Sequence, residues 1–538
     1  MKLTYQGLRD QSVWENAQIA LPPYDPEELS AYTKKHPAWV HFGIGNIFRI
    51  FIGGIADQLI REHSFDRGII CAEAFDYEVV DKIYAPFDNL VLAVTLHEDG
   101  RKEKRVLGCL SEAIKADASR EASWMRLKEI CSDPGLMMIS FTITEKGYAL
   151  KDPDGNYPPY IQNDMKNGPA HAAGAMAVVT AMLLARFQSC AAPIALVSMD
   201  NVSQNGRKFR ESVLETARVW RENGFVDDSF LRYVEDESTV SFPWTMIDKI
   251  TPRPSDEVLS SLLRDGVDDM DIVVTSKHTY IAPFANAEGP QYLVIEDSFP
   301  NGRPPLEKAG VYLASRETVN KSERMKVTVC LNPIHTALCT YDCMLGYTLF
   351  ADGMKDPELS TLAKMLGYQE GLPVVEDPGI LSPERFLDEL FAVRFPNPYL
   401  GDTSARISVD ISQMTAIRFG ETIKSYVKRD GSAQSLTAVP LAIAGWLRYL
   451  LAVDDEGRPF DLSPDPMIPY MQAQLAGIEF GKPESLTDQL KGVLSNVTLF
   501  GTDLYKAGLG DKIESMLREE LAGPGAVRST LKKYLSPS

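Results

Sequence analysis

Two continuous apolar runs constrain the fold of this chain more than any other feature. Residues 136–144 (LMMISFTIT) and 193–199 (PIALVSM) are apolar along nearly their whole length rather than at alternate positions. Such runs are typical of parallel strands that helices bury on both faces. Shorter strand-like runs at 39–42 and 68–72 precede them, with helical patterns between. The sequence therefore predicts an α/β fold whose N-terminal domain is Rossmann-type.

The second half of the chain has a different pattern. From about residue 311 helical periodicity dominates, and the mostly apolar stretch 438–451 is expected to be a core helix. A chain of 538 residues is long enough for two large domains. We therefore expect residues 1–310 to form a Rossmann-type dinucleotide-binding domain. Residues 311–538 are expected to form a mostly α-helical substrate or catalytic domain.

Composition excludes several classes of partner. The net charge of −19 argues against binding to nucleic acid or to anionic membranes, because both attract basic patches. The chain has no run of 18 apolar residues and no signal-peptide pattern, so we expect a cytoplasmic protein. Its seven cysteines include no Cys-x-x-Cys pair, and no His, Cys and carboxylate cluster has zinc-ligand spacing. We therefore expect no bound metal.

A pair of glycines follows the first strand-like run. Residues 39–42 lead into Gly43-Ile-Gly45-Asn46, and the apolar spacing of residues 50–60 is that of a helix. A strand, a Gly-x-Gly turn and a helix form the front of a dinucleotide-binding unit, where the helix N-terminus faces the pyrophosphate. The third glycine of the usual fingerprint is absent. A plain strand–helix turn is therefore the alternative interpretation.

Acidic side chains follow the next strand-like run. Glu73 and Asp76 come directly after residues 68–72. An acidic residue at this position binds the adenosine ribose hydroxyls in many Rossmann domains and favours NAD over NADP. A surface charge at a strand end is the alternative interpretation of Glu73. Further along, residues 89–95 and 104–114 are expected to pair as a hairpin around a turn at 98–100.

Polar residues also follow the two continuous apolar runs. Glu145 and Lys146 come directly after the first run, and Asp200 and Asn201 after the second. Ligands of doubly wound sheets bind beyond the carboxyl ends of the strands, so we expect these side chains at the ligand site, with Glu145 and Lys146 near the cofactor. For Asp200, capping of a turn is the alternative.

A lysine, a carboxamide and an imidazole lie within ten residues, at Lys326, Asn332 and His335. These groups suit reversible hydride transfer to a carbonyl. The lysine can supply the proton, and the amide and imidazole N–H groups can stabilise the developing alkoxide. Asn332 and His335 are three residues apart and share one face of a helix. Alone, such a trio is usually only helix surface.

The order of these motifs resembles the long-chain mannitol dehydrogenase and uronate reductase family, which includes mannitol 2-dehydrogenase, fructuronate reductase and tagaturonate reductase. The resemblance covers residues from about 38 to 470. It implies a Rossmann-type domain, a helical domain, a site between them and metal-independent hydride transfer with NAD(P). The motifs that carry it are Gly43-Ile-Gly45-Asn with Arg49, Ile143-Thr-Glu-Lys-Gly-Tyr148, Asp200-Asn201, Asp248-Lys249-Ile-Thr-Pro252, Glu323-Arg-Met-Lys326, Leu331-Asn332-x-x-His335 and Arg394-Phe-x-Asn397-Pro.

The resemblance also implies roles for single residues. Lys326 would be the general acid and base, Asn201 and Asn332 would hold the substrate oxygen, and His335 would orient the substrate. A carboxylate substrate would need a cation partner, for which Arg394, Lys249 and His278 are the candidates. The residues that we expect to bind the substrate are Arg394, Asp248 and Lys249.

One spacing departs from the family pattern. Lys326 precedes Asn332 by six residues, whereas the resemblance implies a spacing of five. Each residue of an α-helix turns by ~100°, so the extra residue would move the lysine about a quarter-turn away from the face of Asn332 and His335. A bulge or a non-helical segment over 327–329 would bring it back. Otherwise Lys146 is the next candidate for the base. Pro333 suits the first turn of a helix that begins near Asn332.

We therefore expect an NAD-dependent oxidoreductase that interconverts a keto-uronate and an aldonate, with D-fructuronate and D-mannonate as the first choice. Mannitol 2-dehydrogenase activity is the alternative within the same class. From another class, a non-catalytic sensor of a nucleotide or sugar acid would fit the missing third glycine and the displaced lysine. The expected partner is a small sugar acid or polyol, and no oligomeric state is predicted.

Overall fold

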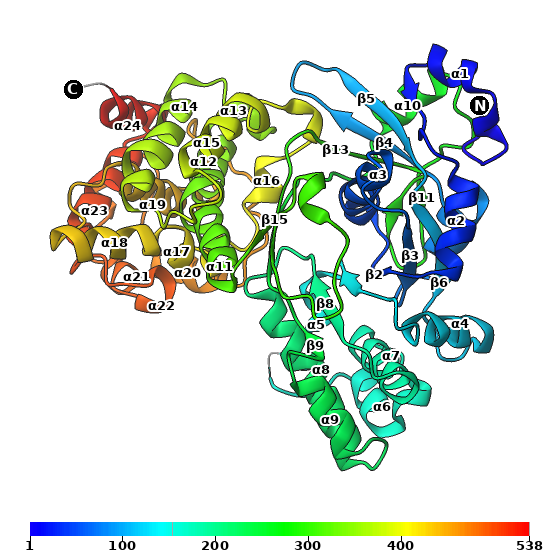
Figure 1. Ribbon diagram of the computed structural model, residues 1–538. Helices are drawn as coiled ribbons and strands as arrows, with labels where there is room; N and C mark the ends of the chain where they lie inside the picture. The colour runs from blue at the N-terminus through cyan, green and yellow to red at the C-terminus, as the bar shows by residue number, and fades with distance from the viewer. Residues whose placement is uncertain (153, 537–538) are drawn as a thin grey trace. The chain divides into compact units, whose positions relative to one another are not determined.

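The computed structural model describes residues 1–152 and 154–536. The chain divides into two compact units, Met1–Asn320 and Lys321–Ser538. Figure 1 shows the helices and strands of both.

A six-stranded parallel sheet forms the centre of the first unit (Figure 1). The strands lie in the order β6-β3-β2-β7-β8-β9, and every neighbouring pair is parallel. Numbered along the chain, this order is 3-2-1-4-5-6, that of a dinucleotide-binding Rossmann sheet. The predicted fold class is confirmed. The strands are β2 (Trp39–Phe42), β3 (Ile69–Glu73), β6 (Leu110–Lys115), β7 (Met138–Phe141), β8 (Ile194–Ser198) and β9 (Val240–Ser241).

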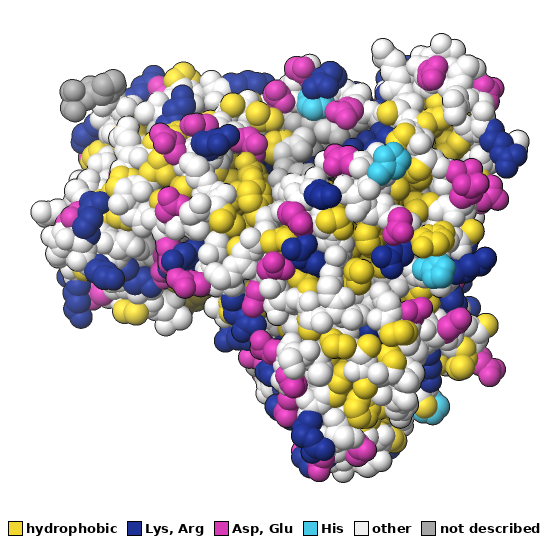
Figure 2. Space-filling view, viewed as in Figure 1, with side chains coloured by type: hydrophobic (Ala, Val, Ile, Leu, Met, Phe, Trp, Pro, Cys, Tyr) yellow, Lys and Arg dark blue, Asp and Glu magenta, His cyan; other side chains and the backbone are white. Residues whose placement is uncertain are grey.

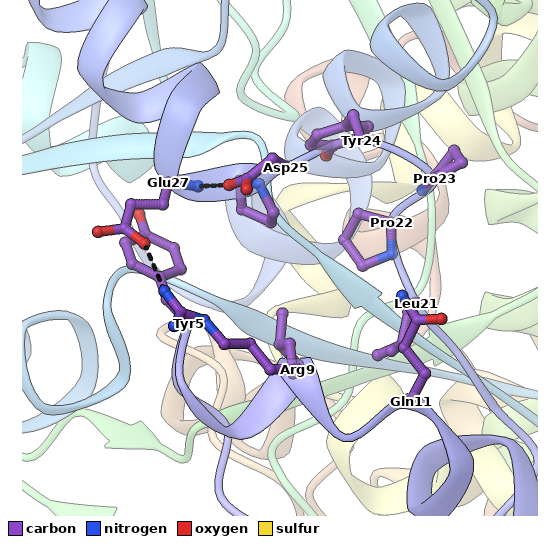
Figure 3. A pocket seen from close by; sticks show the side chains of 11 residues that line it. Tyr5, Arg9, Gln11, Leu21, Pro22, Pro23, Tyr24, Asp25 and Glu27 are labelled. Atoms are coloured by element: carbon purple, nitrogen blue, oxygen red, sulfur yellow. Dashed lines mark hydrogen bonds and ion pairs between the residues drawn. The ribbon is translucent and has the colours of Figure 1, made fainter.

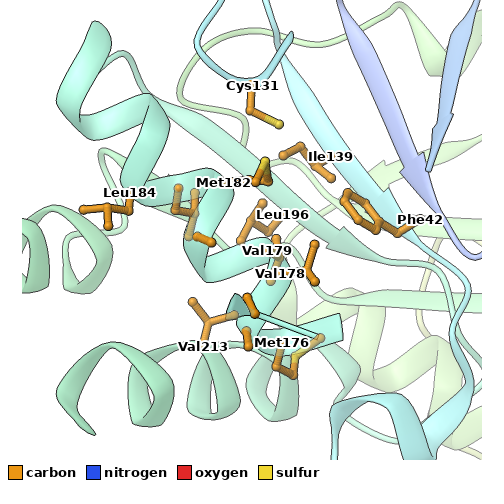
Figure 4. Close-up of a cluster of buried hydrophobic side chains, with 14 of the residues drawn as sticks. Phe42, Cys131, Ile139, Met176, Val178, Val179, Met182, Leu184, Leu196 and Val213 are labelled. Carbon is orange, nitrogen blue, oxygen red and sulfur yellow. The ribbon is translucent and has the colours of Figure 1, made fainter. Parts of the chain in front are cut away.

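Helices cover both faces of this sheet, which explains the continuous apolar runs. Val40 and Ile139 point to one face and belong to the same buried cluster as Met182 and Val213, whose side chains Figure 4 draws. Trp39 and Met138, their neighbours in sequence, point to the opposite face and pack with residues of α3 (Gly53–Arg61). Both faces are buried, so the strands lack the regular apolar–polar alternation of a half-exposed sheet, and their few polar residues, such as His41 and Ser140, are buried too. The helices of the first cluster are α4 (Glu121–Cys131), α6 (Pro159–Asn167), α7 (Ala175–Ser189), α8 (Asn205–Glu222) and α9 (Asp228–Glu235).

A second sheet, in the order β1-β5-β4-β13, corrects one prediction. The antiparallel hairpin of β4 (Val91–Leu96) and β5 (Lys102–Leu107) is present, but the predicted second arm, 104–114, is wrong. The chain leaves the hairpin after β5, and the following residues form β6, which pairs with β3. Only Gly108 and Cys109 separate β5 from β6, so the two strands look like one in sequence. The outer strands are β1 (Ile19–Ala20) and β13 (Phe284–Glu288).

Smaller sheets complete the first unit. β14 (Tyr292–Glu296) pairs with β10 (Thr245–Asp248) on one side and with β15 (Tyr312–Ala314) on the other, so the chain stays in this unit beyond residue 310. β11 (Val273–Val274) and β12 (Tyr280–Ile281) form a short hairpin. The remaining helices are α1 (Gln11–Asn16), α2 (Pro26–Lys35), α5 (Thr144–Tyr148) and α10 (Asp256–Arg264).

The N-terminal arm encloses a cavity of about 340 Å³ (Figure 3). Tyr5, Pro22 and Tyr24 contribute to its wall, and Arg9 pairs with Glu27 across 3.6 Å at its edge. No residue that the sequence predicts for the functional site lines this cavity.

Helices dominate the second unit, as the sequence predicted. α19 is buried at every position and packs against α12 and α23. Gly445 in α19 allows this contact, because a Cβ there would lie 2.3 Å from the Tyr341 ring of α12. The helices are α12 (Asn332–Leu345), α13 (Phe350–Gly353), α14 (Pro357–Lys364), α15 (Pro383–Glu389), α16 (Ser404–Ile407), α17 (Thr415–Arg418), α18 (Gly420–Asp430), α19 (Ala438–Tyr449), α20 (Ile468–Gln474), α21 (Lys491–Leu494), α22 (Val497–Phe500), α23 (Gly510–Glu520) and α24 (Ala526–Leu535); α11 (Arg316–Met325) crosses the boundary of the units.

Within the described parts of the chain, no helix has the length and apolar character that crossing a bilayer requires. Acidic and basic side chains are interspersed over the face that Figure 2 shows.

A buried histidine joins the two central strands of the Rossmann sheet. His41 of β2 is fully buried, with Nδ1 2.6 Å from the Ser140 hydroxyl and Nε2 2.9 Å from the Thr142 hydroxyl. The Thr142 hydroxyl in turn donates to the carbonyl of Gly43. Burial lowers the pKa of His41 well below its ordinary value, so the ring is neutral at physiological pH.

This neutral histidine predicts a loss of stability on acidification. The unfolded chain binds a proton at His41 below about pH 6.5 whereas the folded chain does not, so the free energy of unfolding falls as the pH falls through that value. The slope is at most about 1.4 kcal/mol per pH unit. Urea unfolding of the wild type and of His41→Gln between about pH 7.5 and 5 measures it. A slope that His41→Gln does not reduce would contradict the assignment.

Candidate active site

The carboxyl ends of four adjacent strands gather the predicted cofactor residues at one edge of the sheet. The strands β3, β2, β7 and β8 are neighbours in that order. Their carboxyl ends lead to the predicted residues Glu73 and Asp76, Gly43 to Asn46, Glu145 and Lys146, and Asn201 respectively. The chain reverses its winding between β2 and β7, and Rossmann domains bind ligands at this switch point.

The two glycines of the turn after β2 meet different surroundings. Gly43 has φ +87°, and a Cβ there would lie 2.0 Å from the carbonyl oxygen of Thr142, so only glycine fits. A Cβ at Gly45 would meet no atom of the described residues within 4 Å. The helix begins at Asn46, directly after this open space. An open cradle at a helix N-terminus fits the pyrophosphate of a dinucleotide.

The Asn46 side chain fixes the start of this helix. Its amide nitrogen donates to the carbonyl of Tyr280 (3.1 Å), and its oxygen accepts from Arg49 (2.6 Å). Arg49, which is fully buried, also donates to the carbonyl of Ala282 (2.6 Å). These contacts join the glycine turn to the segment around β12, so Asn46 and Arg49 position the cradle.

Glu73 and Asp76 lie at the tip of β3 and are both buried. The carboxylate of Glu73 accepts hydrogen bonds from the backbone N–H groups of Ile44 (3.3 Å), Phe75 (2.8 Å) and Asp76 (3.1 Å). Burial raises its pKa, and these bonds partly oppose that. Asp76 accepts from the Thr275 hydroxyl at 2.6 Å. A carboxylate has about four acceptor positions, so Glu73 retains about one for a ligand hydroxyl.

Asp200 holds the loop after β7 in place. Its carboxylate accepts from the N–H groups of Ile143 and Thr144, both at 2.9 Å, and from the Tyr148 hydroxyl at 2.7 Å. Thr144 has φ +65°, a conformation that costs free energy outside glycine and that these bonds stabilise. The structural interpretation of Asp200, as a cap of this turn, is therefore confirmed.

The other predicted residues of the first unit vary in exposure. Asn201, Glu145 and Lys146 are exposed, and Glu145 pairs with Lys208 at 2.6 Å. Asp248 is buried at the end of β10. Lys249 donates through Nζ to the carbonyl of Glu288 at 2.8 Å. Asp248 ends β10 of the three-stranded sheet and Lys249 directly follows it, so neither belongs to the Rossmann edge.

A π-helical turn carries Lys326 in the second unit. Residues Lys326–Cys330 form this segment, and the N–H of Leu331 donates to the carbonyl of Lys326 at 3.1 Å. A π-helical bond spans five residues instead of four, so the turn holds one residue more than an α-helical turn. This wide turn accommodates the extra residue between Lys326 and Asn332. The Lys326 side chain is buried.

Asn332 and His335 lie on the first turn of α12, which begins at Asn332 as predicted, with Pro333 in its first turn. The Asn332 side-chain oxygen is buried and has no hydrogen-bond partner among the described residues. The His335 ring packs edge-on against Phe350 (4.6 Å between centroids) and at 5.3 Å from Phe395. Two phenylalanine rings thus pack against the imidazole.

Arg394 directly precedes Phe395 and ends another π-helical segment, Leu390–Arg394. A third such segment, Phe48–Ile52, contains Arg49. Three motif residues of this chain, Arg49, Lys326 and Arg394, therefore lie in π-helical turns. Such turns frequently mark functional positions, although two further π-helical segments, Val80–Tyr84 and Met365–Gly371, carry no motif residue.

Within the described residues, no three His, Cys, Asp or Glu side chains cluster in a way that would hold a metal ion.

Comparison with family models matches almost the whole chain. Residues 37–308 match the mannitol dehydrogenase Rossmann domain, and residues 318–519 match the mannitol dehydrogenase C-terminal domain. The chain belongs to the mannitol dehydrogenase family. The family resemblance predicted from the motifs is confirmed.

Curated relatives cover the full length. A D-mannonate oxidoreductase of Thermotoga maritima is 49% identical over 538 residues, which are 99% of each chain. A D-mannonate oxidoreductase of Escherichia coli is 27% identical over 91% of this chain and 93% of its own.

Solved structures share the fold. A D-sorbitol dehydrogenase in substrate-free form aligns with a TM-score of 0.79 and 25% identity, over 97% of this chain and 98% of its own. Mannitol 2-dehydrogenase of Pseudomonas fluorescens aligns with a TM-score of 0.71 and 24% identity, over 99% of both chains.

Two residues that contact the predicted site residues could not be identified from the sequence. Thr275 reaches Asp76 from 199 positions away, and Tyr280 offers its backbone carbonyl to Asn46 across 234 positions. No local spacing predicts such contacts, because only the folded chain brings the β11–β12 hairpin to the Rossmann edge.

The two glycines give a matched pair of substitutions. Gly43→Ala should destabilise the fold by about 2 kcal/mol or more, because it combines positive φ with a backbone clash. Gly45→Ala should leave the melting temperature nearly unchanged yet weaken dinucleotide binding ~10-fold or more, because its methyl group fills the cradle. Calorimetric melting and fluorescence titration with NADH separate the two effects. Normal NADH affinity in Gly45→Ala would show that the cradle lies elsewhere.

Proposed function

We propose that this protein is an NAD-dependent oxidoreductase that interconverts D-fructuronate and D-mannonate. The full-length 49% identity with the Thermotoga maritima D-mannonate oxidoreductase carries the proposal. The oxidoreductase class follows from membership of the mannitol dehydrogenase family. A metal-independent reaction and a cytoplasmic location remain predictions from the sequence.

The first unit supplies the proposed dinucleotide site. The space beside Gly45 and the helix start at Asn46 would receive the pyrophosphate. The remaining acceptor position of Glu73 would bind a ribose hydroxyl. The bound nicotinamide supplies or accepts the hydride.

Lys326 is the proposed proton donor in reduction and proton acceptor in oxidation. Reduction of a ketone places a hydride on the carbon and a proton on the oxygen, and this proton needs a donor within reach. Lys326 sits on the turn that leads directly into Asn332. The structural support is its burial and the π-helical turn that takes up the additional residue.

Asn332 and His335 are proposed to hold the substrate on the α12 side. The buried Asn332 oxygen has no partner among the described residues, and a substrate hydroxyl would satisfy it while the amide nitrogen donates to a substrate oxygen. His335, packed against Phe350 and Phe395, would orient the substrate. Asn201 is proposed as a further amide donor. Arg394, Asp248 and Lys249 remain proposed substrate contacts.

Mannitol oxidation to fructose is the second candidate function. It is supported by a mannitol 2-dehydrogenase of Phaeosphaeria nodorum, 28% identical over 98% of this chain and 85% of its own. Because this identity is lower than the 49% of the D-mannonate oxidoreductase, mannitol oxidation is the second choice.

A substrate panel followed at the NADH absorbance band decides between these activities. We expect D-fructuronate to be reduced with a kcat/KM well above that of D-fructose, and dialysis against a chelator to leave the rate intact. A higher kcat/KM for fructose would favour the mannitol reaction. Absence of turnover with every hexuronate and ketose would favour a non-catalytic sensor.

The acidic tip of β3 predicts a preference for NADH over NADPH. Glu73 and Asp76 would repel a 2′-phosphate. Glu73→Gln removes one charge and keeps an acceptor oxygen for the N–H groups of Phe75 and Asp76, so the ratio of kcat/KM values for NADH and NADPH should fall. Steady-state kinetics with both cofactors measure that ratio. A wild type faster with NADPH would overturn the assignment.

Removal of the Lys326 amine should slow catalysis without loss of cofactor affinity. Lys326→Ala is expected to reduce kcat by ~10²–10⁴-fold, with a similar dissociation constant for NADH. Primary amines added to the buffer should restore part of the rate. The matched control is Lys424→Ala, which removes an exposed lysine of α18 that pairs with Glu421. If Lys326→Ala keeps most of its activity, another group is the acid.

A further inference from the structure

Arg418 is a cation without a counter-charge beside the proposed substrate helix. It ends α17, and its Nη1 donates to the Thr336 hydroxyl on α12. This is the only hydrogen bond of the guanidinium within residues 1–152 and 154–536, and no carboxylate of those residues pairs with it. Among the described residues, neither Nε nor Nη2 has a hydrogen-bond partner. Nε is buried from solvent, whereas Nη2 is not among the buried atoms.

Most other arginines of the second unit are balanced by acidic side chains. Arg448, which is more deeply buried, is instead satisfied by backbone carbonyls at all three nitrogens. Burial lowers the pKa of Arg418, as expected of a half-buried cation, yet an arginine stays charged at neutral pH. An uncompensated charge of this kind costs stability. The arginines with acidic partners include Arg324, Arg406, Arg429, Arg458 and Arg528.

A second unsatisfied polar group lies on the same helix. Thr336, which holds Arg418, follows Asn332 by four residues, so the two lie one turn apart on one face of α12. The Asn332 oxygen is also buried without a partner among the described residues. Asn332, whose oxygen lacks a donor, and Thr336, which holds the guanidinium of Arg418, thus lie one helical turn apart, ~5.4 Å along the axis of α12.

We propose that Arg418 binds the carboxylate of the sugar acid and so selects uronates over neutral sugars. This inference rests on the proposed function. In D-fructuronate three carbons separate the keto carbon from the carboxylate, a span comparable with one helical turn (~5.4 Å). A substrate whose keto end lies near Asn332 therefore brings its carboxylate to Arg418. The carboxylate binds at Nη2, while Thr336 fixes Nη1 and the guanidinium plane.

The cations suggested by the sequence are less suited to this task. The positive charge of Arg394 already acts on Asp402, where it opposes the burial that raises the pKa of that carboxyl. The Lys249 amine donates to the Glu288 carbonyl. His278 lies exposed between β11 and β12, in the first unit.

The test removes the charge of Arg418 while keeping most of its side-chain volume. Arg418→Met, Arg418→Lys and the control Arg429→Met, which removes an exposed arginine paired with Asp430, are compared with the wild type. The measurements are kcat and KM for D-fructuronate and D-fructose with NADH, and the dissociation constant of D-mannonate by calorimetry.

We expect Arg418→Met to raise the KM for fructuronate and the mannonate dissociation constant ~10- to 100-fold, the usual effect of losing a charged hydrogen bond. The ratio of kcat/KM for fructuronate to that for fructose should fall by a similar factor. Arg418→Lys should recover part of the loss. The melting temperature of Arg418→Met should not fall, because an uncompensated charge is removed.

Different outcomes separate this inference from the function on which it rests. If the wild type turns over fructuronate but Arg418→Met leaves KM and mannonate affinity within about threefold, the inference fails alone. Equal losses with fructuronate and fructose would show a merely structural role and also overturn it. A wild type that neither reduces fructuronate nor binds mannonate would overturn the proposed function and this inference together.

Discussion

Two carboxylates, those of the buried Glu73 and the half-buried Asp200, determine the shape of the Rossmann edge. Glu73 accepts the backbone N–H of Ile44 and thereby ties the end of β3 to the glycine turn after β2. Asp200 accepts the N–H groups of Ile143 and Thr144 and ties the end of β8 to the loop after β7. Each carboxylate therefore holds in place the loop that follows the neighbouring strand. Because both faces of the sheet are buried in apolar clusters, the strand ends are where polar groups collect and where a ligand finds donors.

Helical irregularity has a comparable role in the second unit. The π-helical turn Lys326–Cys330 holds one residue more than an α-helical turn, which takes up the additional residue that the family resemblance implied, and α12 still starts at Asn332. The turn is packed closely, since a Cβ at Gly371 would lie 2.6 Å from the Val329 side chain. An inserted residue is thus absorbed within one turn, and the following helix keeps its register.

Two polar groups with incomplete interactions, one on α12 and one beside it, distinguish this part of the second unit. Among the described residues, Arg418 has a hydrogen bond to Thr336 but no acidic partner, and the Asn332 oxygen has no donor, whereas Arg324 and Arg429 pair with carboxylates. Proteins rarely bury polar groups in this way unless a ligand or a strained function compensates. A recognition site for a sugar acid gives both groups a partner at once, and links the family chemistry to one class of substrate.

The sequence by itself determined the fold class, because apolar runs bounded by polar strand ends have few arrangements other than a doubly wound sheet. It also located Gly43, Glu73 and Asp200 at strand ends and the start of α12, since these depend on local spacing. Only the tertiary structure decided that residues 110–115 leave the hairpin for β3, that a π-helical turn lies between Met325 and Asn332, and that no carboxylate of the described residues pairs with Arg418. Those features depend on strand pairing, backbone hydrogen bonding and side-chain contacts between residues far apart in the chain, and no local pattern encodes them.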